Sequence, residues 1–384
     1  MRVLIAFDKF KDSMTAEEAC HRAAQSIQSL HPEWQIDRAP LTDGGDGFGR
    51  ILTASVHGEV KRVPATGPLM EPREGEYGLV QIEALPDAAR GLLTGLPAKG
   101  RLALIEMASI NGLALVPLAD RTPWTTTTLG TGQVLQAAAS TGVDGILLGV
   151  GGSATNDLGL GALAALGFSF LRADGTPVFP PIPAQWNSVT RMEGCLACPC
   201  PPIWIACDVD NPLLGDRGAS AVFGPQKGLI ETDLPRMESE MHRLADLLGS
   251  FLGRDTDLQS HPGSGAAGGI AFGLMAATGA TLVPGSDLMT AWLRLRERIA
   301  EADIVITGEG RFDRSSLAGK GPAEVAGRAL AQGKRTIVMA GSIEDGLETG
   351  AELHSISPRE LPLEQALREG PENLASTVRR VLKS

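Results

Sequence analysis

One glycine-rich stretch decides how this chain folds: Gly149-Val150-Gly151-Gly152-Ser153-Ala154-Thr155-Asn156-Asp157. The apolar run 145–148 before it predicts a buried strand, and the Leu- and Ala-rich residues 158–166 after it predict a helix. Glycines let the backbone bend sharply and bring its amides close to a ligand, while a helix N-terminus adds partial positive charge. The turn therefore suits a phosphate or a carboxylate, although a plain strand-to-helix connection with an N-cap explains it equally well.

Other apolar runs also end in polar loops, several of them rich in glycine. Residues 2–7 lead into Asp8-Lys9-Phe10-Lys11, ahead of a helix predicted over 16–30 from the capping box of Thr15 and Glu18. Residues 35–41 lead into Thr42-Asp43-Gly44-Gly45-Asp46-Gly47, whose carboxylates suit Mg²⁺ or a general base, although Asp-Gly is equally a turn signal. The pattern recurs later in the chain, around residues 203–212 and 303–316, and a further glycine-rich stretch, 263–269, precedes a predicted helix.

This alternation predicts an α/β protein whose mostly parallel sheets are flanked by helices, in a Rossmann-like or flavodoxin-like arrangement. Prolines and glycines become frequent after residue 61, which indicates that the chain enters a second domain there. We therefore expect residues 1–64 and 286–384 to form one discontinuous domain, with residues 65–285 as an inserted α/β domain. The active site is expected in the cleft between them, because ligands bind at the carboxyl ends of parallel strands.

Composition and charge exclude several classes of protein. The chain has 384 residues, 43% of them hydrophobic and 21% charged, which is typical of a globular protein with room for two domains. The net charge is −11, and no run of like charge is long enough to bind nucleic acid. The apolar run 3–7 is too short for a signal peptide or a membrane span, so we expect a cytoplasmic protein with no membrane partner.

An acidic surface repels anions, so an anion site has to be built locally from lysines, arginines and backbone amides. Lys227 is a candidate, because it stands in the turn Phe223-Gly224-Pro225-Gln226-Lys227-Gly228, which we expect to leave it accessible. The cysteines at 195, 198, 200 and 207 are interpreted as free thiols and not as a zinc site, because their spacing is irregular and prolines crowd them.

Three classes of function remain open at this point. The pattern Gly149-x-Gly151-x-x-Ala154, with Asp174 about twenty residues later, matches a dinucleotide fingerprint and supports an NAD-dependent oxidoreductase. A non-enzymatic protein that binds small anions would also show glycine loops. A phosphotransferase has to position phosphates, neutralise charge and supply a carboxylate near the attacking hydroxyl, and the loops offer each part. A Walker A motif is absent, so a kinase here needs another phosphate-binding architecture.

Seven motifs, taken in order along residues 1 to about 345, resemble those of the bacterial type I glycerate kinases. They are Asp8-Lys9-Phe10-Lys11, the 42–47 loop, Gly151 to Asp157, Ala206 to Pro212, Phe223 to Gly228, Gly265 to Gly269 and Thr307 to Asp313. The resemblance implies ATP-dependent phosphorylation of D-glycerate with Mg²⁺, favouring the 2-hydroxyl, and a fold in which the second domain is inserted into the first. The expected partners are these small molecules, with the protein as a monomer or homodimer.

The resemblance and the loop positions imply the following roles. Lys11, Lys227 and Arg311 are expected to meet carboxylate or phosphate charge, and Asp43 or Asp208 to accept the hydroxyl proton. Asp157 and Glu309 are expected to bind Mg²⁺. The remaining substrate or nucleotide contacts are assigned to Asp8, Gly44, Gly45, Gly151, Gly152, Ser153, Thr155, Asn156 and Asn211.

Overall fold

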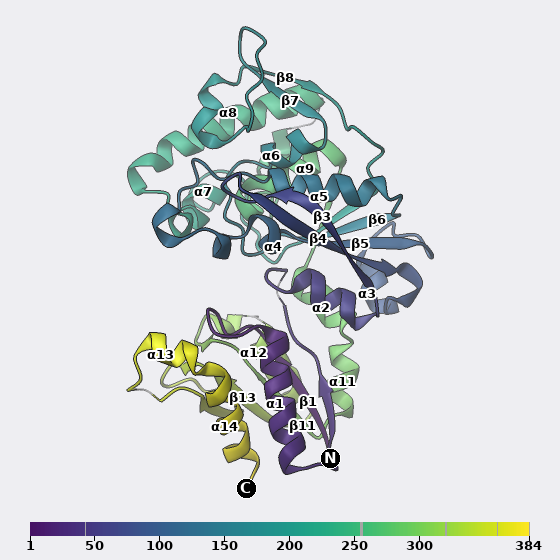
Figure 1. Cartoon of the computed structure of the whole chain (residues 1–384), viewed down its shortest axis with the longest axis vertical. Coiled ribbons are helices and arrows are strands. Elements are labelled where there is room, and N and C mark those ends of the chain that lie inside the picture. Colours follow the sequence, from purple (N-terminus) through teal and green to yellow (C-terminus); the bar gives the residue numbers. More distant parts are fainter. Residues whose placement is uncertain (43, 254–255, 319–320, 359, 384) are drawn as a thin grey trace. The chain divides into compact units, whose positions relative to one another are not determined.

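The structure, a computed structural model, describes residues 1–42, 44–253, 256–318, 321–358 and 360–383 (Figure 1). The chain divides into two compact units, Met1–Asp43 with Ser286–Ser384, and Gly44–Gly285. Both units are α/β, as the sequence predicts.

The first unit is built on a five-stranded, fully parallel sheet in the order β15-β13-β11-β1-β2. Renumbered along the unit, this order is 2-1-3-4-5, the flavodoxin-like order in which the direction of winding reverses between β1 and its neighbour β11. Such a reversal leaves a crevice at the carboxyl ends of the two strands. The strands are β1 (Arg2–Phe7), β2 (Gln35–Arg38), β11 (Ile304–Gly308), β13 (Arg335–Ala340) and β15 (Glu352–Ser355).

Helices cover this sheet because each buries an apolar stripe against it. Residues on one face, including Ile5 and Ile306, share a core with α1 (Ala16–Leu30) and α14 (Gly370–Leu382). On the other face, Val338 packs with Ala326 of α12 (Gly321–Ala331). The capping box that predicts α1 is confirmed, because the Glu18 amide donates to Thr15 Oγ1 at 3.1 Å and the Thr15 amide donates to Glu18 Oε2 at 2.9 Å.

The second unit contains a six-stranded sheet in the order β10-β9-β6-β5-β4-β3. The four strands from β10 to β5 are parallel, and β4 and β3 are antiparallel. One face shares a large core with α5 (Leu129–Ser140), α6 (Leu160–Ala165), α8 (Leu234–Leu252) and α9 (Ala266–Thr278). The strands are β3 (Glu59–Thr66), β4 (Pro72–Gln81), β5 (Arg101–Glu106), β6 (Gly145–Gly149), β9 (Ile203–Ala206) and β10 (Thr281–Val283).

The first division of the chain falls after residue 43, whereas the sequence places it after residue 64. The reason is that α2 (Phe48–Ser55) packs on β4 and β5 of the second unit. It does so closely, since a Cβ at Gly78 of β4 would lie 1.7 Å from Thr53 Oγ1. The proline- and glycine-rich segment after residue 61 forms the β3–β4 hairpin and therefore continues the second unit.

Two further predicted elements differ in the structure. The sequence of residues 287–302 predicts a single amphipathic helix. The structure has two helices there, α10 (Gly285–Trp292) and α11 (Leu295–Glu301), because Arg294 adopts a left-handed conformation with φ 52°. The helix expected from residue 158 begins at Leu160. The other elements are α3 (Asp87–Leu92), α4 (Met107–Asn111), α7 (Ala219–Phe223), α13 (Leu363–Arg368), β7 (Phe168–Leu171), β8 (Arg191–Gly194), β12 (Arg311–Phe312) and β14 (Ser342–Ile343).

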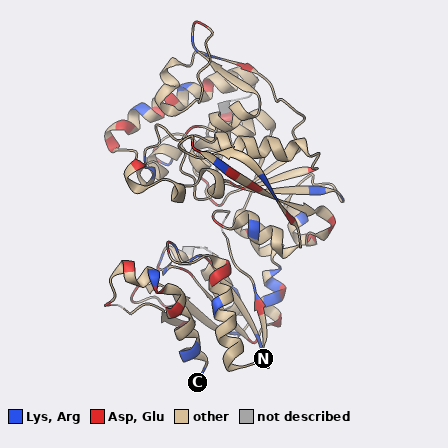
Figure 2. Ribbon diagram, in the orientation of Figure 1, with Lys and Arg blue, Asp and Glu red and all other residues tan. Residues whose placement is uncertain are grey.

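Charged residues of both signs are interspersed over the elements of each unit (Figure 2). On the β3–β4 hairpin, for example, Lys61 pairs with Glu59 and Arg62 with Glu74. Within the parts of the chain that the structure describes, no helix combines the length and apolar character needed to cross a membrane.

Candidate active site

In the first unit, the sequence-predicted residues gather where the winding of the sheet reverses. Asp8 and Lys9 follow β1, and Glu309 follows β11, its parallel neighbour. The two loops touch through their backbones: the Asp8 amide donates to Gly308 O at 2.9 Å, and a Cβ at Gly310 would lie 2.9 Å from the Lys11 amide nitrogen. The structure thus brings Asp8, Lys11 and Glu309 to one edge of this sheet.

The side chains at this edge differ in exposure. Asp8 and Glu309 are half-buried, whereas Lys11 is exposed. The Arg311 side chain is 74% exposed, and its Nε lies 3.0 Å from Asp313 Oδ2. Lys11 and Arg311 are therefore accessible cations in the two loops that also carry Asp8 and Glu309. This combination suits the binding of a polyanion together with a divalent cation.

In the second unit, the 149–157 loop and the 42–47 loop are in direct backbone contact. The Gly151 amide donates to Gly44 O at 3.0 Å. A Cβ at Gly149 would lie 2.6 Å from that same oxygen, and a Cβ at Gly151 would lie 2.8 Å from the Gly45 nitrogen. No side chain fits at these positions without moving the loops apart, so the glycines are required by close packing.

Two further loops join this group at the carboxyl ends of the strands. A Cβ at Gly44 would lie 3.3 Å from Ala206 O, at the end of β9, which places the 42–47 loop beside the segment that continues to Asp208 and Asn211. The Gly265 amide donates to Asn211 O at 3.0 Å, and the Leu158 amide donates to Gly268 O at 3.0 Å. Four sequence-predicted loops are thereby assembled at one edge of this sheet.

Lys227 lies beneath the 149–157 loop and is only 2% exposed, contrary to the expectation that its turn leaves it accessible. Its Nζ donates to Thr155 O at 2.6 Å and to Ser153 Oγ at 3.2 Å. Burial lowers the pKa of this amine to about 7, with the charge of Asp157 acting in the opposite direction. Lys227 therefore supports the loop from inside the protein.

Asp157 is also buried, and hydrogen bonds to protein groups engage both of its oxygens. Its Oδ2 accepts from the Thr128 amide at 2.7 Å and from Thr128 Oγ1 at 2.8 Å, and its Oδ1 accepts from the Gly159 amide at 3.2 Å. Burial raises the pKa of the carboxyl, and these hydrogen bonds act against that rise. This environment does not fit the expected magnesium ligand, because the carboxylate faces inward and ties the loop to the start of α5.

Two buried oxygens next to Lys227 have no hydrogen-bond partner among the described residues. They are Thr155 Oγ1 and Asn156 Oδ1, while Asn156 Nδ2 donates to Ser220 Oγ at 3.0 Å. A buried polar atom without a partner costs roughly 1–3 kcal/mol. Such atoms are retained most easily where they serve a ligand.

The other predicted residues stand as follows. Asp208 is exposed, and the Asn211 side chain donates to Arg217 O at 2.8 Å. Asp43 lies outside the described residues. Among those described, Cys195, Cys198, Cys200 and Cys207 are free thiols, and no group of three His, Cys, Asp or Glu side chains is arranged to hold a metal ion.

Sequence reasoning missed Glu106, which ends β5 beside these loops. The side chain is buried, and its Oε2 accepts from the Gly49 amide at 3.1 Å. A signal was present in the sequence, because Glu106 ends an apolar run just as Asp8 and Asp208 follow theirs.

The dinucleotide hypothesis fails on geometry. A dinucleotide fingerprint needs the helix to open within the glycine turn, but α6 begins at Leu160, eleven residues after β6 ends at Gly149. Asp174 lies in an exposed turn, where its Oδ1 accepts from the Thr176 amide at 2.9 Å, and not at a strand end.

Known proteins resemble this chain along nearly its whole length. The model of the glycerate kinase family matches residues 3–384. A protein of Halalkalibacterium halodurans named glycerate kinase is 36% identical, over 99% of this chain and 97% of its own. A protein of Escherichia coli K12 named glycerate 2-kinase is 36% identical, over 90% of this chain and 86% of its own.

A solved structure agrees with these sequence relatives. The crystal structure of a putative glycerate kinase 2 from Salmonella typhimurium LT2 superimposes with a TM-score of 0.75 at 36% identity, covering 99% of this chain and 97% of its own. Neither the oxidoreductase nor the non-enzymatic binding protein finds support among these relatives.

The packing of the two glycine loops predicts the effect of adding one methyl group. Gly151→Ala should destabilise the protein by about 1–3 kcal/mol, because the new Cβ overlaps the backbone of Gly45. The matched control is Gly91→Ala in α3, where a Cβ meets no atom within 4 Å. Urea unfolding should show a lower midpoint for Gly151→Ala and an unchanged or higher one for Gly91→Ala; equal midpoints would contradict the packing described.

Proposed function

Because this chain belongs to the glycerate kinase family, we propose that it transfers the γ-phosphoryl group of ATP to the 2-hydroxyl of D-glycerate, with Mg²⁺ as cofactor. The observation that carries the proposal is the assembly of glycine loops over the buried Lys227 at one sheet edge. The choice of the 2-hydroxyl rests on the motifs of the sequence and on the name of the Escherichia coli relative. We place the reaction in the cytoplasm, where ATP is available.

Phosphoryl transfer depends mainly on positioning and on stabilisation of charge. We assign the binding of phosphate or carboxylate oxygens to the amides of Gly152 and Ser153, in a loop that we call the phosphate loop (residues 149–157). The Gly151 amide donates to Gly44 O and so fixes this loop instead of binding the ligand. Lys227, which bonds to this loop from below, adds positive charge without contacting the ligand. The unpaired oxygens of Thr155 and Asn156 suit hydroxyl donors of the substrate.

The first unit carries charges suited to the same reaction. Lys11 and Arg311 would neutralise phosphate oxygens, and Asp8 and Glu309 are the carboxylates best suited to Mg²⁺, which is commonly held by one or two carboxylates together with substrate phosphates. When bound, Mg²⁺ would offset the charge of the transferred group. Asp157 has no part in this set, because its oxygens accept hydrogen bonds from the protein.

The activity itself is tested with purified protein, ATP, Mg²⁺ and D-glycerate. ADP should form only when glycerate is present, and enolase alone should convert the product, since enolase acts on 2-phosphoglycerate. A requirement for added phosphoglycerate mutase before enolase acts would show transfer to the 3-hydroxyl. Folded protein that forms no ADP with glycerate would overturn the proposed function.

Either Asp43 or Asp208 is expected to accept the proton of the attacking hydroxyl. Replacing the general base by asparagine should lower kcat by about 10²–10⁴-fold, because the amide cannot take up a proton. The control is Asp210→Asn, since Asp210 lies near Asp208 but forms an exposed ion pair with Arg217 at 2.8 Å. Near-normal kcat in both Asp43→Asn and Asp208→Asn would remove these residues from the chemistry.

Lys227→Met keeps the apolar stem of the side chain and removes its charge. If that charge stabilises the transferred group through the phosphate loop, kcat/KM should fall by about 10²–10³-fold. Since the pKa of Lys227 is near 7, its charge is lost as the pH rises, so kcat/KM of the unmodified enzyme should carry a decline above about pH 7 that this variant lacks.

The control is Lys61→Met, because Lys61 is an exposed partner of Glu59. Steady-state kinetics between about pH 6 and 9 measure kcat/KM and its dependence on pH, across the range in which a lysine with so low a pKa titrates. Unaltered kcat/KM in a folded Lys227→Met protein would show that the buried amine has no role in catalysis.

A further inference from the structure

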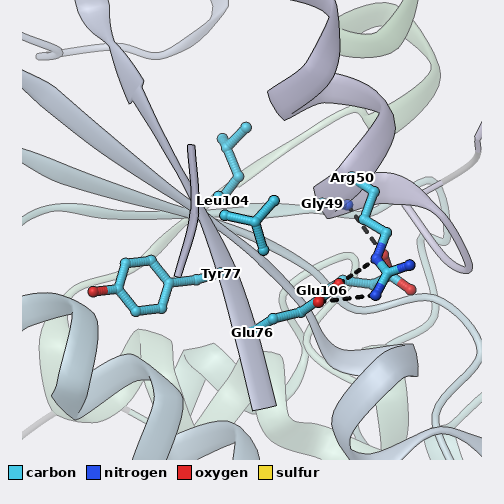
Figure 3. Close-up of a pocket in the computed structure, with 8 residues that line it drawn as sticks. Gly49, Arg50, Glu76, Tyr77, Leu104 and Glu106 are labelled. Atoms are coloured by element: carbon cyan, nitrogen blue, oxygen red, sulfur yellow. Dashed lines mark hydrogen bonds and ion pairs between the residues drawn. The ribbon is translucent and has the colours of Figure 1, made fainter. Parts of the chain in front are cut away.

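Glu106 stands at the end of β5 and contacts the first turn of a helix from another part of the unit. Its side chain is 8% exposed, and Oε2 accepts from the Gly49 amide of α2 at 3.1 Å. Figure 3 shows this contact beside the ion pair between Arg50 and Glu76, in which Arg50 Nη2 lies 2.9 Å from Glu76 Oε2. The tie between Glu106 and α2 links residues 57 positions apart in the chain.

The start of α2 needs such an acceptor. The first amides of a helix have no partner within the helix, and side chains at the N-cap usually satisfy them. Here the N-cap is Gly47, with φ 87°, which has no side chain to offer. Glu106 therefore caps α2 from a neighbouring strand, where its negative charge also meets the positive end of the helix.

The helix start is joined directly to the 42–47 loop. The Phe48 amide donates to Gly45 O at 3.1 Å, and Gly44 O accepts from the Gly151 amide at 3.0 Å. A chain of contacts thus runs from Glu106 through the first turn of α2 and Gly44 to the phosphate loop. Displacing the first turn of α2 would change the position of both loops.

We propose that Glu106 is a positioning residue for phosphoryl transfer: its carboxylate fixes the first turn of α2 and thereby holds the 42–47 loop against the phosphate loop. The inference rests on the proposed function and adds to it a residue that touches neither glycerate nor ATP. Misplacement of reacting groups by about 1 Å can reduce turnover 10²-fold, so a support of this kind has a measurable effect.

The buried carboxylate of Glu106 lowers the stability of the folded protein. Burial raises the pKa of its carboxyl to about 7, and nearby Asp46 and Glu76 add to the rise, while the amides of Gly47 and Gly49 act against it. Arg50, the cation nearby, is paired with Glu76. The folded protein therefore binds more protons than the unfolded chain between the two pKa values, so stability falls as the pH rises from about 4.5 to 7.

The test compares Glu106→Gln with Glu76→Gln at pH 8, about one unit above the pKa of Glu106. Glutamine retains one acceptor oxygen but lacks the charge, so kcat should fall about tenfold with little change in KM, as expected when positioning is lost. The thermal midpoint should be unchanged or higher, because a buried charge has been removed. Glu76→Gln, which removes the charge of a neighbouring carboxylate, should keep its kcat.

Hydrogen exchange provides a readout that does not depend on activity. The amides of residues 44–49 should exchange faster in Glu106→Gln than in the unmodified protein, and Glu76→Gln should show no such change. If these amides respond but the unmodified protein does not phosphorylate glycerate, the proposed function fails while the structural tie stands. A Glu106→Gln protein that has normal kcat, or that unfolds more readily at pH 8, would overturn the proposal.

Discussion

The candidate site depends on backbone-to-backbone contact between glycine loops. At Gly149 and Gly151 the phosphate loop approaches Gly44 and Gly45 so closely that a single Cβ would overlap main-chain atoms. This approach brings together loops from strands that are distant in the chain. Glycines at the carboxyl edge of a sheet also allow backbone amides to come close to a ligand, which favours the binding of phosphate oxygens.

Buried ionisable groups support these loops from within. Lys227 bonds to the underside of the phosphate loop, Asp157 ties its end to Thr128, and Glu106 caps the helix that follows the 42–47 loop. Burial favours the neutral form of each group, so it raises the pKa of the two carboxyls and lowers the pKa of the amine. The arrangement sacrifices stability, and such arrangements are concentrated at functional sites, where positioning outweighs the loss.

Local sequence signals predict the helices and strands well, but they do not reveal contacts between residues that are far apart in the chain. The capping box of Thr15 and Glu18 and the apolar run 145–148 act within a few residues, so the sequence suffices for α1 and β6. The burial of Lys227 and the inward orientation of Asp157 depend on packing against Thr155 and Thr128, which no spacing in the chain reveals. The division of the chain after residue 43 likewise depends on distant contacts, since the segment after residue 61 forms a hairpin with a partner strand.

In the proposed function, amides of the phosphate loop bind the anionic group of the substrate. The most direct measurement is NMR of protein labelled with ¹⁵N-glycine and titrated with 2-phosphoglycerate. Saturable chemical-shift changes are expected at Gly152, with smaller ones at Gly151 and at Gly44 and Gly45, which contact Gly151. Saturable shifts confined to glycines of other loops, with Gly151 and Gly152 unchanged, would contradict this assignment.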